Sequence, residues 1–414
     1  MSYLRTVPGM EKRHPRRRLW SWTAGATAAR TGDEMSGPAL LLAGLAVTGS
    51  PASASALLAG ATAAAAVGGP LIGVLLDRSP APGRLLAAVL AGHALALTAV
   101  LVCLGRAPLG WTVLIAVAAG LLAPALAGGW SAQLPNVVPA GALPRAGALD
   151  ALTFNAAALA GPALAGGTAQ LAGARAGVVA SAVLICLALP AALRLPRRTA
   201  GAPPYPLSAG IASEIAAGFR AITRVPPLAR ATAVTAVSCA GEGMLVACAP
   251  LLGERALGGA GHGALLLTGI AVVALAAGAL PARRHGPPSP DTVLPVSALL
   301  LAAATALAAT AAPVPLAAAV VLAGVGQGAQ LTALFAIRHR EAPGRLRAQV
   351  FTTGASLKLT GFAAGAALAG PLALWSLPGA LLTAAAVQLL AALPGVKPCA
   401  GRRRERGAGT DGRA

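Results

Sequence analysis

The chain has 414 residues, of which 56% are hydrophobic and only 11% are charged, and its mean hydropathy is +0.73. A water-soluble core cannot use so much apolar surface, whereas a bilayer needs about 20 apolar residues for every helix that crosses it. The composition therefore excludes a soluble globular protein and predicts an integral membrane protein with many spans.

The N-terminal residues are polar and basic, and we expect an uncleaved first helix to follow them. Twelve apolar segments then predict twelve helices, because every backbone polar group in lipid must be satisfied within its own segment. The first six cover residues 20–49, 52–76, 85–105, 111–134, 147–171 and 175–195. The other six cover residues 230–252, 260–280, 292–312, 314–337, 350–374 and 376–396.

The region between the sixth and seventh segments is rich in Pro and Arg and contains an amphipathic stretch that predicts a short surface helix. The predicted fold is therefore an all-α integral membrane protein with two six-helix bundles. The predicted boundaries are a basic tail at 1–19, a bundle at 20–196, a linker at 197–229, a bundle at 230–396 and a basic tail at 397–414.

The basic residues are distributed unevenly between the two sides of the predicted bundle. If the N-terminus is cytosolic, 27 of the 32 Lys and Arg residues fall on the cytosolic side, three fall in opposite loops, and Arg30 and Lys358 fall within spans. This bias fits the positive-inside rule with both termini in the cytosol. The net charge of +20 is then explained by contact with anionic headgroups, and nucleic-acid binding is not expected.

The residue types that mark enzymes and metal sites show no suitable spacing. The five cysteines and five histidines form neither a disulfide framework nor a ligand pattern. None of the three lysines follows a glycine, as a nucleotide-binding P-loop requires. We therefore expect no enzyme activity, no cofactor and no metal.

The two halves of the chain resemble each other at a nearly constant offset. Pro139, Gly161, Leu164 and Gly166 recur 204 residues later, and the string GDEM in the first segment faces GEGM in the seventh at an offset of 209. Two parallel six-helix repeats with a site between them are a plan typical of secondary transporters.

The stretch GVLLDRSPAPGR ends the second apolar segment abruptly. Topology alone explains charges at a helix end, and the glycine and prolines favour a tight turn. The stretch also resembles the signature loop between helices two and three of the major facilitator superfamily. The matching residues are Gly73, Asp77, Arg78, Gly83 and Arg84. The resemblance implies that Asp77 engages Arg78 and the N-terminus of a helix in the other half, and the helix beginning near Phe351 is the expected partner.

Two further segments resemble the bacterial drug-efflux and siderophore-exporter branch of that superfamily. Residues 124–150 are similar to its region between helices four and five, and GPALAGG is similar to the antiporter motif of helix five. The motif residues are Gly161, Pro162, Gly166 and Gly167. The resemblance covers nearly the whole chain and implies efflux, but it does not indicate a substrate.

Ionisable residues within predicted spans are costly and usually functional, and they are Arg30, Asp33, Glu34, Glu242 and Lys358. Arg30 precedes the first two acids by three and four residues, so all three can share one side of a helix. They form either a structural pair, in which Arg30 neutralises one acid, or part of a proton-coupling site. The second interpretation follows because acids outnumber bases, and an unpaired carboxylate in a low dielectric readily binds a proton.

Uncharged polar residues within spans are candidates for the substrate cavity, and they are Trp130, Asn155, Gln327 and Gln330. The resemblance implies that Trp130 and Gln327 line the cavity, although packing would explain both equally well. His93, in the third segment, is interpreted as a hydrogen-bonded interior residue rather than as a ligand.

The sequence thus predicts a monomeric secondary transporter in the plasma membrane that exports small amphipathic molecules in exchange for protons by alternating access. Its partners would be a small-molecule substrate, protons and the lipid bilayer. An uptake permease on the same fold, and a membrane scaffold or sensor without transport activity, are the alternatives. The direction of flux separates the first two, and dispensable acids without any flux would favour the third.

Overall fold

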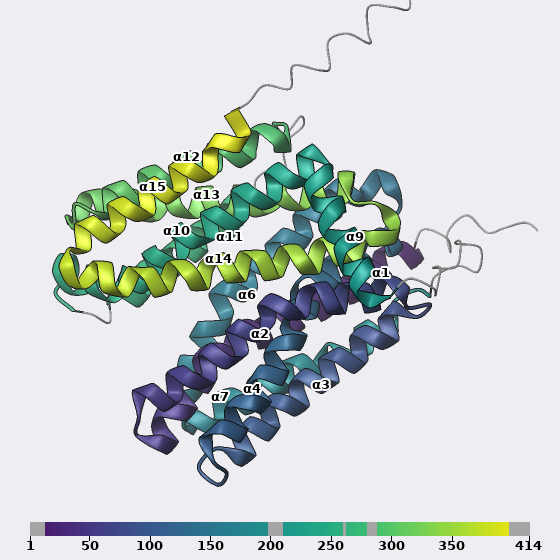
Figure 1. The fold of residues 1–414 in the computed structure, drawn as a ribbon, viewed down its shortest axis with the longest axis horizontal. Coiled ribbons are helices and arrows are strands. Elements are labelled where there is room, and N and C mark those ends of the chain that lie inside the picture. Colours follow the sequence, from purple (N-terminus) through teal and green to yellow (C-terminus); the bar gives the residue numbers. More distant parts are fainter. Residues whose placement is uncertain (1–12, 198–209, 260–261, 280–287, 397–414) are drawn as a thin grey trace, which may run out of the picture.

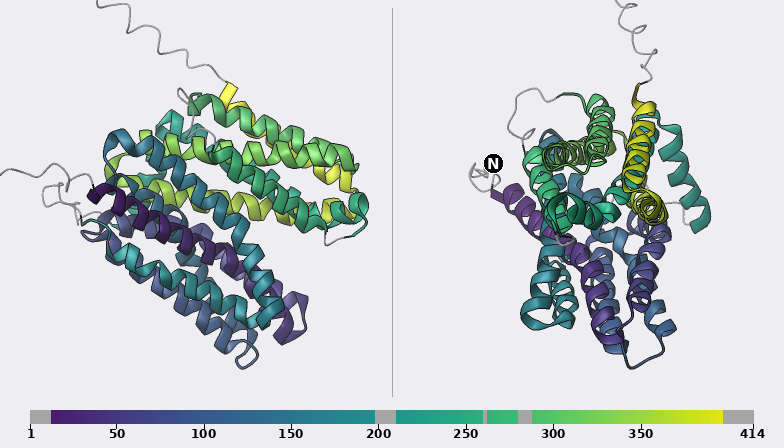
Figure 2. Two further views of the ribbon diagram at one scale, coloured as in Figure 1. Left: turned by 180° about the vertical axis from the view of Figure 1, so that it is seen from behind. Right: turned by 90° about the vertical axis from the view of Figure 1, so that its left-hand side faces the viewer.

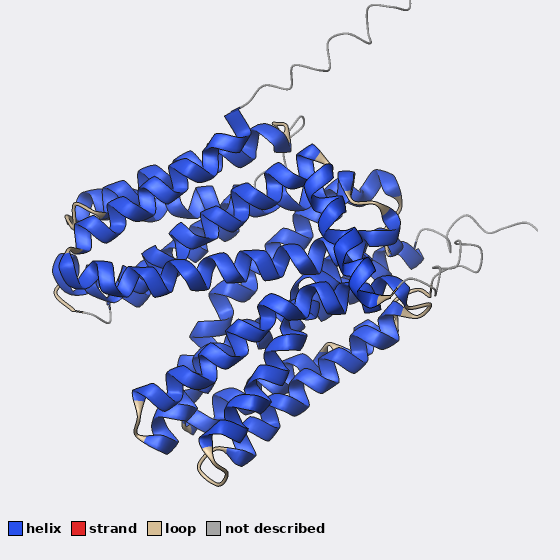
Figure 3. Cartoon of the chain, viewed as in Figure 1, coloured by secondary structure: helices blue, strands red, loops and turns tan. Residues whose placement is uncertain are grey.

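The computed structural model describes residues 13–197, 210–259, 262–279 and 288–396. The predicted tails, apart from the start of the first helix, and the first part of the predicted linker lie outside these residues. The described residues form helices joined by short loops and contain no strand (Figure 3).

The helices of the first half form one bundle and those of the second half another (Figure 1). The first bundle contains α1 (Arg13–Thr48), α2 (Pro51–Arg78), α3 (Pro82–Cys103), α4 (Leu109–Pro124), α5 (Trp130–Gln133), α6 (Leu143–Ala172), α7 (Ala174–Leu187) and α8 (Leu189–Leu193). After the linker helix α9 (Ile211–Arg224), the second bundle contains α10 (Pro226–Leu257), α11 (His262–Ala279), α12 (Pro290–Ala308), α13 (Pro313–Glu341), α14 (Arg347–Trp375) and α15 (Leu377–Val396).

Ten helical stretches within the described residues are long and apolar enough to cross a membrane. They match the second to eleventh predicted segments in order. The first segment is α1, which carries three charged residues near its middle, and the twelfth is the shorter apolar helix α15. The predicted all-helical membrane fold is therefore confirmed.

Several helices extend beyond the apolar segments that predicted them. α1 begins at Arg13 rather than at residue 20, α10 begins at Pro226 rather than at 230, and α13 ends at Glu341 rather than at 337. Hydropathy marks where lipid contact ends, whereas the backbone hydrogen-bond ladder continues into polar residues outside it. The expected boundaries are corrected accordingly.

Local sequence accounts for many helix ends. Proline, whose fixed φ suits the first turn, begins several helices, including those at Pro51, Pro82, Pro226 and Pro313. α10 ends at Gly258, whose φ of 76° lies in the left-handed region that a side chain would strain.

The same helix pairs recur in both bundles. α1 packs along α6 and α7, just as α10 packs along α14 and α15, and α2 packs along α4 as α11 does along α13. Figure 2 shows the two bundles from behind and from one end. The recurrence agrees with the internal repeat read from the sequence.

The two bundles meet mainly at one end, which we call the closed end and define by Asp77, Glu214 and Arg347. The hydrogen bonds between bundles among the described residues connect α2 with α14, from the closed end inward, and α6 with α11. From there α2 and α14 diverge toward the opposite end (Figure 1).

Candidate functional site

Among the described residues, the most deeply buried ion pair joins Arg30 of α1 to Asp150 of α6. The guanidinium Nη1 lies 2.6 Å from the Asp150 Oδ1 atom, and the two side chains are 2% and 0% exposed. Sequence spacing suggested Asp33 or Glu34 as the partner of Arg30, and the structure corrects that pairing. Asp150, on a different helix, is therefore the acid that neutralises this base.

An irregular helical turn between α4 and α5 supplies a hydrogen-bond acceptor to Arg30. Residues 125–129 form a π-helical turn, in which widened spacing frees backbone carbonyls for other donors. Arg30 donates to the Ala127 carbonyl oxygen at 3.2 Å, to the Ser131 hydroxyl at 3.0 Å and to the Thr153 hydroxyl. Its guanidinium carbon also lies 3.8 Å from the centre of the Phe154 ring. This side chain is thus held as an internal brace of the first bundle.

With Arg30 occupied elsewhere, Asp33 and Glu34 face different surroundings. The Asp33 side chain is 23% exposed, and its Oδ1 atom lies 3.8 Å from Nε2 of His93 on α3. His93 is buried, with Nδ1 3.0 Å from the Ala119 carbonyl oxygen, so it is a hydrogen-bonded interior residue as expected. Glu34 is exposed, and its backbone lies against Gly161 of α6.

Lys358 links acids from the two bundles. On α14, it lies within electrostatic reach of both Glu34 on α1 and Glu242 on α10. The Glu242 carboxylate also lies 3.9 Å from the Cys239 thiol. Lys358 therefore acts electrostatically on two of the predicted coupling acids, while Arg30 is paired with Asp150 and Asp33 lies beside His93.

The aromatic candidate for the cavity is a packing residue in this conformation. Trp130 is fully buried, its ring meets that of Trp22 edge-on at 6.3 Å, and its carbonyl oxygen accepts a hydrogen bond from the Trp22 indole at 3.3 Å. Gln327, the other residue placed beside substrate by resemblance, is half-buried on α13.

The two amide candidates make specific contacts. Gln330 donates to the Ser238 hydroxyl at 3.0 Å, and that hydroxyl donates to the Gln388 carbonyl at 2.6 Å, which ties α13, α10 and α15 together. Asn155 donates from α6 to the Ala274 carbonyl of α11 at 3.3 Å, so it fastens one bundle to the other. Polar satisfaction of a buried network explains the contacts of Gln330, and the Asn155 contact joins the two bundles.

Asp77 caps a helix of the opposite bundle. Its two carboxylate oxygens accept hydrogen bonds from the backbone N–H groups of Ala348 at 3.0 Å and Gln349 at 2.9 Å. Leu346, at the N-cap of α14, supplies no side-chain cap of its own. A carboxylate from α2 thus satisfies orphan donors and meets the positive end of the helix dipole. The partner is the helix expected from the sequence, which begins at Arg347.

Arg78 makes a contact that the sequence did not indicate. Its guanidinium donates to both carboxylate oxygens of Glu214 on α9, at 2.8 and 2.5 Å. The Gln349 amide in turn donates to the Glu214 backbone oxygen at 2.8 Å. The amphipathic stretch in the linker predicted a surface helix, but nothing in it identified α9 as the element that contacts α2 and α14 together.

Glycines allow α2 to approach α14 closely at the closed end. Gly69 and Gly73 share a helix face with Asp77, and a Cβ on Gly73 would collide with backbone and side-chain atoms of Gln349 and Thr352. In the same loop, Gly83 lies against α8, and Arg84 is exposed. The motif therefore combines a close crossing with a cap.

The helix-five motif also begins with a close crossing. A Cβ on Gly161 would lie 2.8 Å from the backbone carbon of Glu34, so α6 can touch α1 only through a glycine here. Gly365 of α14 lies equally close to Ala240 of α10, which is the corresponding crossing in the second bundle. Pro162 is exposed, and nothing lies within 4 Å of a Cβ on Gly166 or Gly167.

A buried cationic group in α13 was missed by sequence reasoning. Arg338 is 2% exposed, and its guanidinium carbon lies 5.7 Å from the centre of the Phe351 ring, while the His339 ring lies 4.8 Å from the same ring. The apolar segment ends at residue 337, so hydropathy placed Arg338 in a loop. Aromatic residues at the start of the next predicted helix were the available signal.

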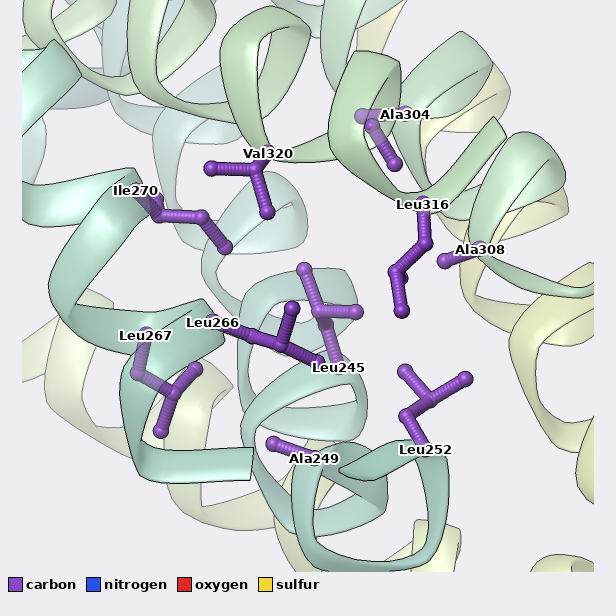
Figure 4. A pocket seen from close by; sticks show the side chains of 11 residues that line it. Leu245, Ala249, Leu252, Leu266, Leu267, Ile270, Ala304, Ala308, Leu316 and Val320 are labelled. Carbon is purple, nitrogen blue, oxygen red and sulfur yellow. The ribbon is translucent and has the colours of Figure 1, made fainter. Parts of the chain in front are cut away.

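A small cavity lies inside the second bundle, between α10, α11, α12 and α13 (Figure 4). It encloses about 20 Å³ and is lined only by Leu, Ile, Val and Ala side chains. A volume of that size holds about one water molecule, and an apolar lining disfavours even that. This cavity is a packing gap and not a substrate site. Among the described residues, no group of three or more His, Cys, Asp or Glu side chains is placed to hold a metal ion.

Comparison with known proteins identifies relatives by sequence pattern and by fold. The family model of the Major Facilitator Superfamily matches residues 23–288. No curated protein sequence matches the chain significantly.

Among solved structures, the human organic anion transporter TETRAN has a TM-score of 0.75 at 16% identity, covering 94% of this chain and 100% of that one. A bacterial homologue of the iron transporter ferroportin, in an outward-facing state, has a TM-score of 0.75 at 16% identity, with 92% and 98% covered. The fucose:proton symporter of Escherichia coli has a TM-score of 0.63 at 18% identity, with 93% and 100% covered. At these identities the likeness establishes the fold alone.

Proposed function

The chain belongs to the major facilitator superfamily of secondary transporters, and we propose that it exports small amphipathic molecules in exchange for protons. Alternating access between the two bundles would carry the substrate across the membrane. Both termini and the closed end would then face the cytosol, since basic residues such as Arg78, Arg345 and Arg347 gather there.

The position of three carboxylates supports proton coupling. Asp33 and Glu34 lie near the middle of α1, and Glu242 lies near the middle of α10. Arg30 is already paired with Asp150, and Lys358 is the cation within reach of Glu34 and Glu242. Negative charge in excess at this depth is stabilised when a proton or a cationic substrate group binds, and competition between the two provides the coupling of an antiporter.

The conformation supports the proposed gating. With the closed end in the cytosol, the structure corresponds to a state open to the outside, in which Asp77 and the α9 contacts hold the cytosolic side shut. Reopening requires the cap on α14 and the Asn155 contact to break, and such hydrogen bonds contribute about 1.5–3 kcal/mol each to a charged group and about 0.5–1.5 kcal/mol between neutral groups. A latch of that strength can be formed and released in every cycle.

Export is tested by expressing the protein in a host that lacks its own efflux pumps and challenging it with a panel of amphipathic compounds. We expect reduced susceptibility to at least one compound with the wild-type protein, and none with Asp33→Asn at equal membrane abundance. Inverted vesicles then give the direction of flux for that compound. Accumulation inside inverted vesicles supports export, whereas substrate-driven proton entry in right-side-out cells would identify an uptake permease.

A scaffold or sensor without transport activity is the remaining outcome. It would be indicated if no compound in the panel moves and if neutral variants of Asp33, Glu34 and Glu242 behave as the wild-type protein does. In that case the fold would be retained and the transport proposal rejected.

A further inference from the structure

We propose that His93 is the second half of the proton site, so that one proton is shared between its Nε2 atom and the carboxylate of Asp33. This inference rests on the proposed proton coupling and adds a positioning residue to it. It places the shared proton inside the first bundle, between α1 and α3, rather than on an isolated carboxylate.

The hydrogen bond on one side of the His93 ring determines what the other side can do. Nδ1 lies 3.0 Å from the Ala119 carbonyl oxygen, which only accepts, so Nδ1 must carry a hydrogen. In the neutral ring, Nε2 is then left as an acceptor. Nε2 is buried without a hydrogen-bond partner, and it faces Oδ1 of Asp33 at 3.8 Å.

Two acceptors that face each other cannot bond until a proton arrives. A separation of 3.8 Å exceeds hydrogen-bond distance and leaves no room for a bridging water, as expected for an ionised carboxylate opposite an unprotonated nitrogen. When a proton enters, it forms a bond to either Oδ1 or Nε2 and a hydrogen bond to the other atom. The pair then changes from a net charge of −1 to zero, as a neutral acid beside a neutral imidazole or as a carboxylate–imidazolium ion pair.

The geometry also gives the proton a route. The Asp33 side chain is 23% exposed, whereas that of His93 is 3% exposed. Asp33 is therefore the accessible partner that can exchange a proton, while His93 holds the proton from the buried side. Ala119, on a different helix, keeps the imidazole oriented toward the acid.

The other charged groups on the surrounding helices do not replace either partner of the contact between Asp33 and His93. Glu34 is the charged neighbour that acts on Asp33, and Arg30 is neutralised by Asp150. α4 and α8 carry no ionisable side chain. The remaining groups lie toward the ends of their helices, and they are Arg84 and Cys103 on α3, Asp77 and Arg78 on α2, Arg145 on α6, and Arg175 and Cys186 on α7.

Infrared titration of the purified protein in lipid tests the sharing without any substrate. The carboxylic acid signal that Asp33→Asn removes is assigned to Asp33, and its pH midpoint is then measured in His93→Asn. Asparagine keeps the donor to Ala119 but cannot reach the position of Nε2. We expect the midpoint to move by about one pH unit toward acid, a roughly tenfold loss of proton affinity, because the protonated acid loses its acceptor.

His339→Asn serves as the matched control, since it removes a buried histidine from the second bundle. It should leave the Asp33 signal unchanged. If His93→Asn titrates like the wild-type protein, the sharing is refuted. If that variant cannot be recovered, the infrared bands of the imidazole and the carboxyl group in the wild-type protein provide the test. A shared proton requires both bands to change with pH at one common midpoint. Two independent midpoints would refute the sharing.

The outcome is distinguishable from failure of the proposed function. Normal pH-driven flux in Asp33→Asn would reject Asp33 as the coupling site altogether. If Asp33 is essential for pH-driven flux but its pH midpoint is the same in His93→Asn, only the present inference is rejected.

Discussion

Arg30 and Asp150 determine which charges remain available for transport. Both side chains are almost fully buried, and the pair is surrounded by hydroxyl groups and an aromatic ring. A buried pair of this kind contributes little net stability, but loss of one partner leaves an uncompensated charge. The pair therefore holds α1 against α6 in the first bundle, and Arg30 does not neutralise Asp33 or Glu34.

Asp150→Asn is expected to destabilise the folded protein by about 3–5 kcal/mol, because it strands the Arg30 guanidinium in the interior. Thermal unfolding of the solubilised protein measures the change. Combining Arg30→Met with Asp150→Leu should recover most of the loss, since neither charge then remains. A single Asp150→Asn variant as stable as the wild-type protein would show that the pair does not exist.

Lys358→Met is expected to shift the pH profile of transport toward alkaline pH. Removal of the cation leaves the Glu34 and Glu242 carboxylates without their positive neighbour, so they bind protons at higher pH than before. Lys358→Arg preserves the charge and should keep the wild-type profile. Initial rates of flux over a pH series measure the shift. Identical pH profiles for the wild-type protein and Lys358→Met would show that Lys358 does not act on these two carboxylates.

At the scale of helices, the sequence was sufficient for the number and order of the elements. Long apolar runs and the internal repeat predict twelve helices. Ten helical stretches of the described residues are long and apolar enough to cross a membrane, and the first and twelfth segments correspond to α1 and to the shorter apolar helix α15. Helix ends were less predictable, since the hydrogen-bond ladder of α13 continues past the apolar run to Glu341.

Pairings between distant helices could not be predicted from local patterns. The spacing of Arg30 and Glu34 satisfied a rule for neighbours on one helix, whereas the actual partner is 120 residues away on α6. Glu214 likewise had no signal that pointed to Arg78. The partner of Asp77 was predictable only through the resemblance of its motif, since the cap depends on how two bundles dock.

Arg78→Ala and Glu214→Gln are expected to reduce transport to a similar and moderate extent. Arg78→Ala removes both hydrogen bonds between α2 and α9, and Glu214→Gln removes the negative charge and one of the two acceptors, so the double variant should be no worse than Arg78→Ala alone. Flux at equal membrane abundance measures the three variants. Fully additive losses would mean that the two residues act through different contacts.

Gly73→Leu is expected to prevent the closed end from forming, because its side chain would occupy the space of Gln349 and Thr352 on α14. Gly370→Leu is the matched control, as nothing lies within 4 Å of a Cβ there. Spin-label distances between α2 and α14 at the closed end report the change. An unaltered distance distribution in Gly73→Leu would contradict the close crossing.

At the scale of the whole molecule, one hydrophobic core continues from the first bundle into part of the second, and the rest of the second bundle has a core of its own. The cap by Asp77 and the α9 contacts lie at the closed end. The carboxylates lie in the middle of α1 and α10, beyond these contacts. A change in charge at mid-depth and a change in contact at the closed end are therefore the two events that transport must link.

Proton-driven accumulation in liposomes decides whether that link exists. Purified protein is reconstituted, a compound identified in the susceptibility panel is added at equal concentration on both sides, and only a pH gradient is imposed. We expect the wild-type protein to accumulate the compound against its own gradient, and Asp33→Asn to equilibrate it without accumulation. Continued accumulation by both Asp33→Asn and Glu242→Gln would contradict proton coupling through these carboxylates.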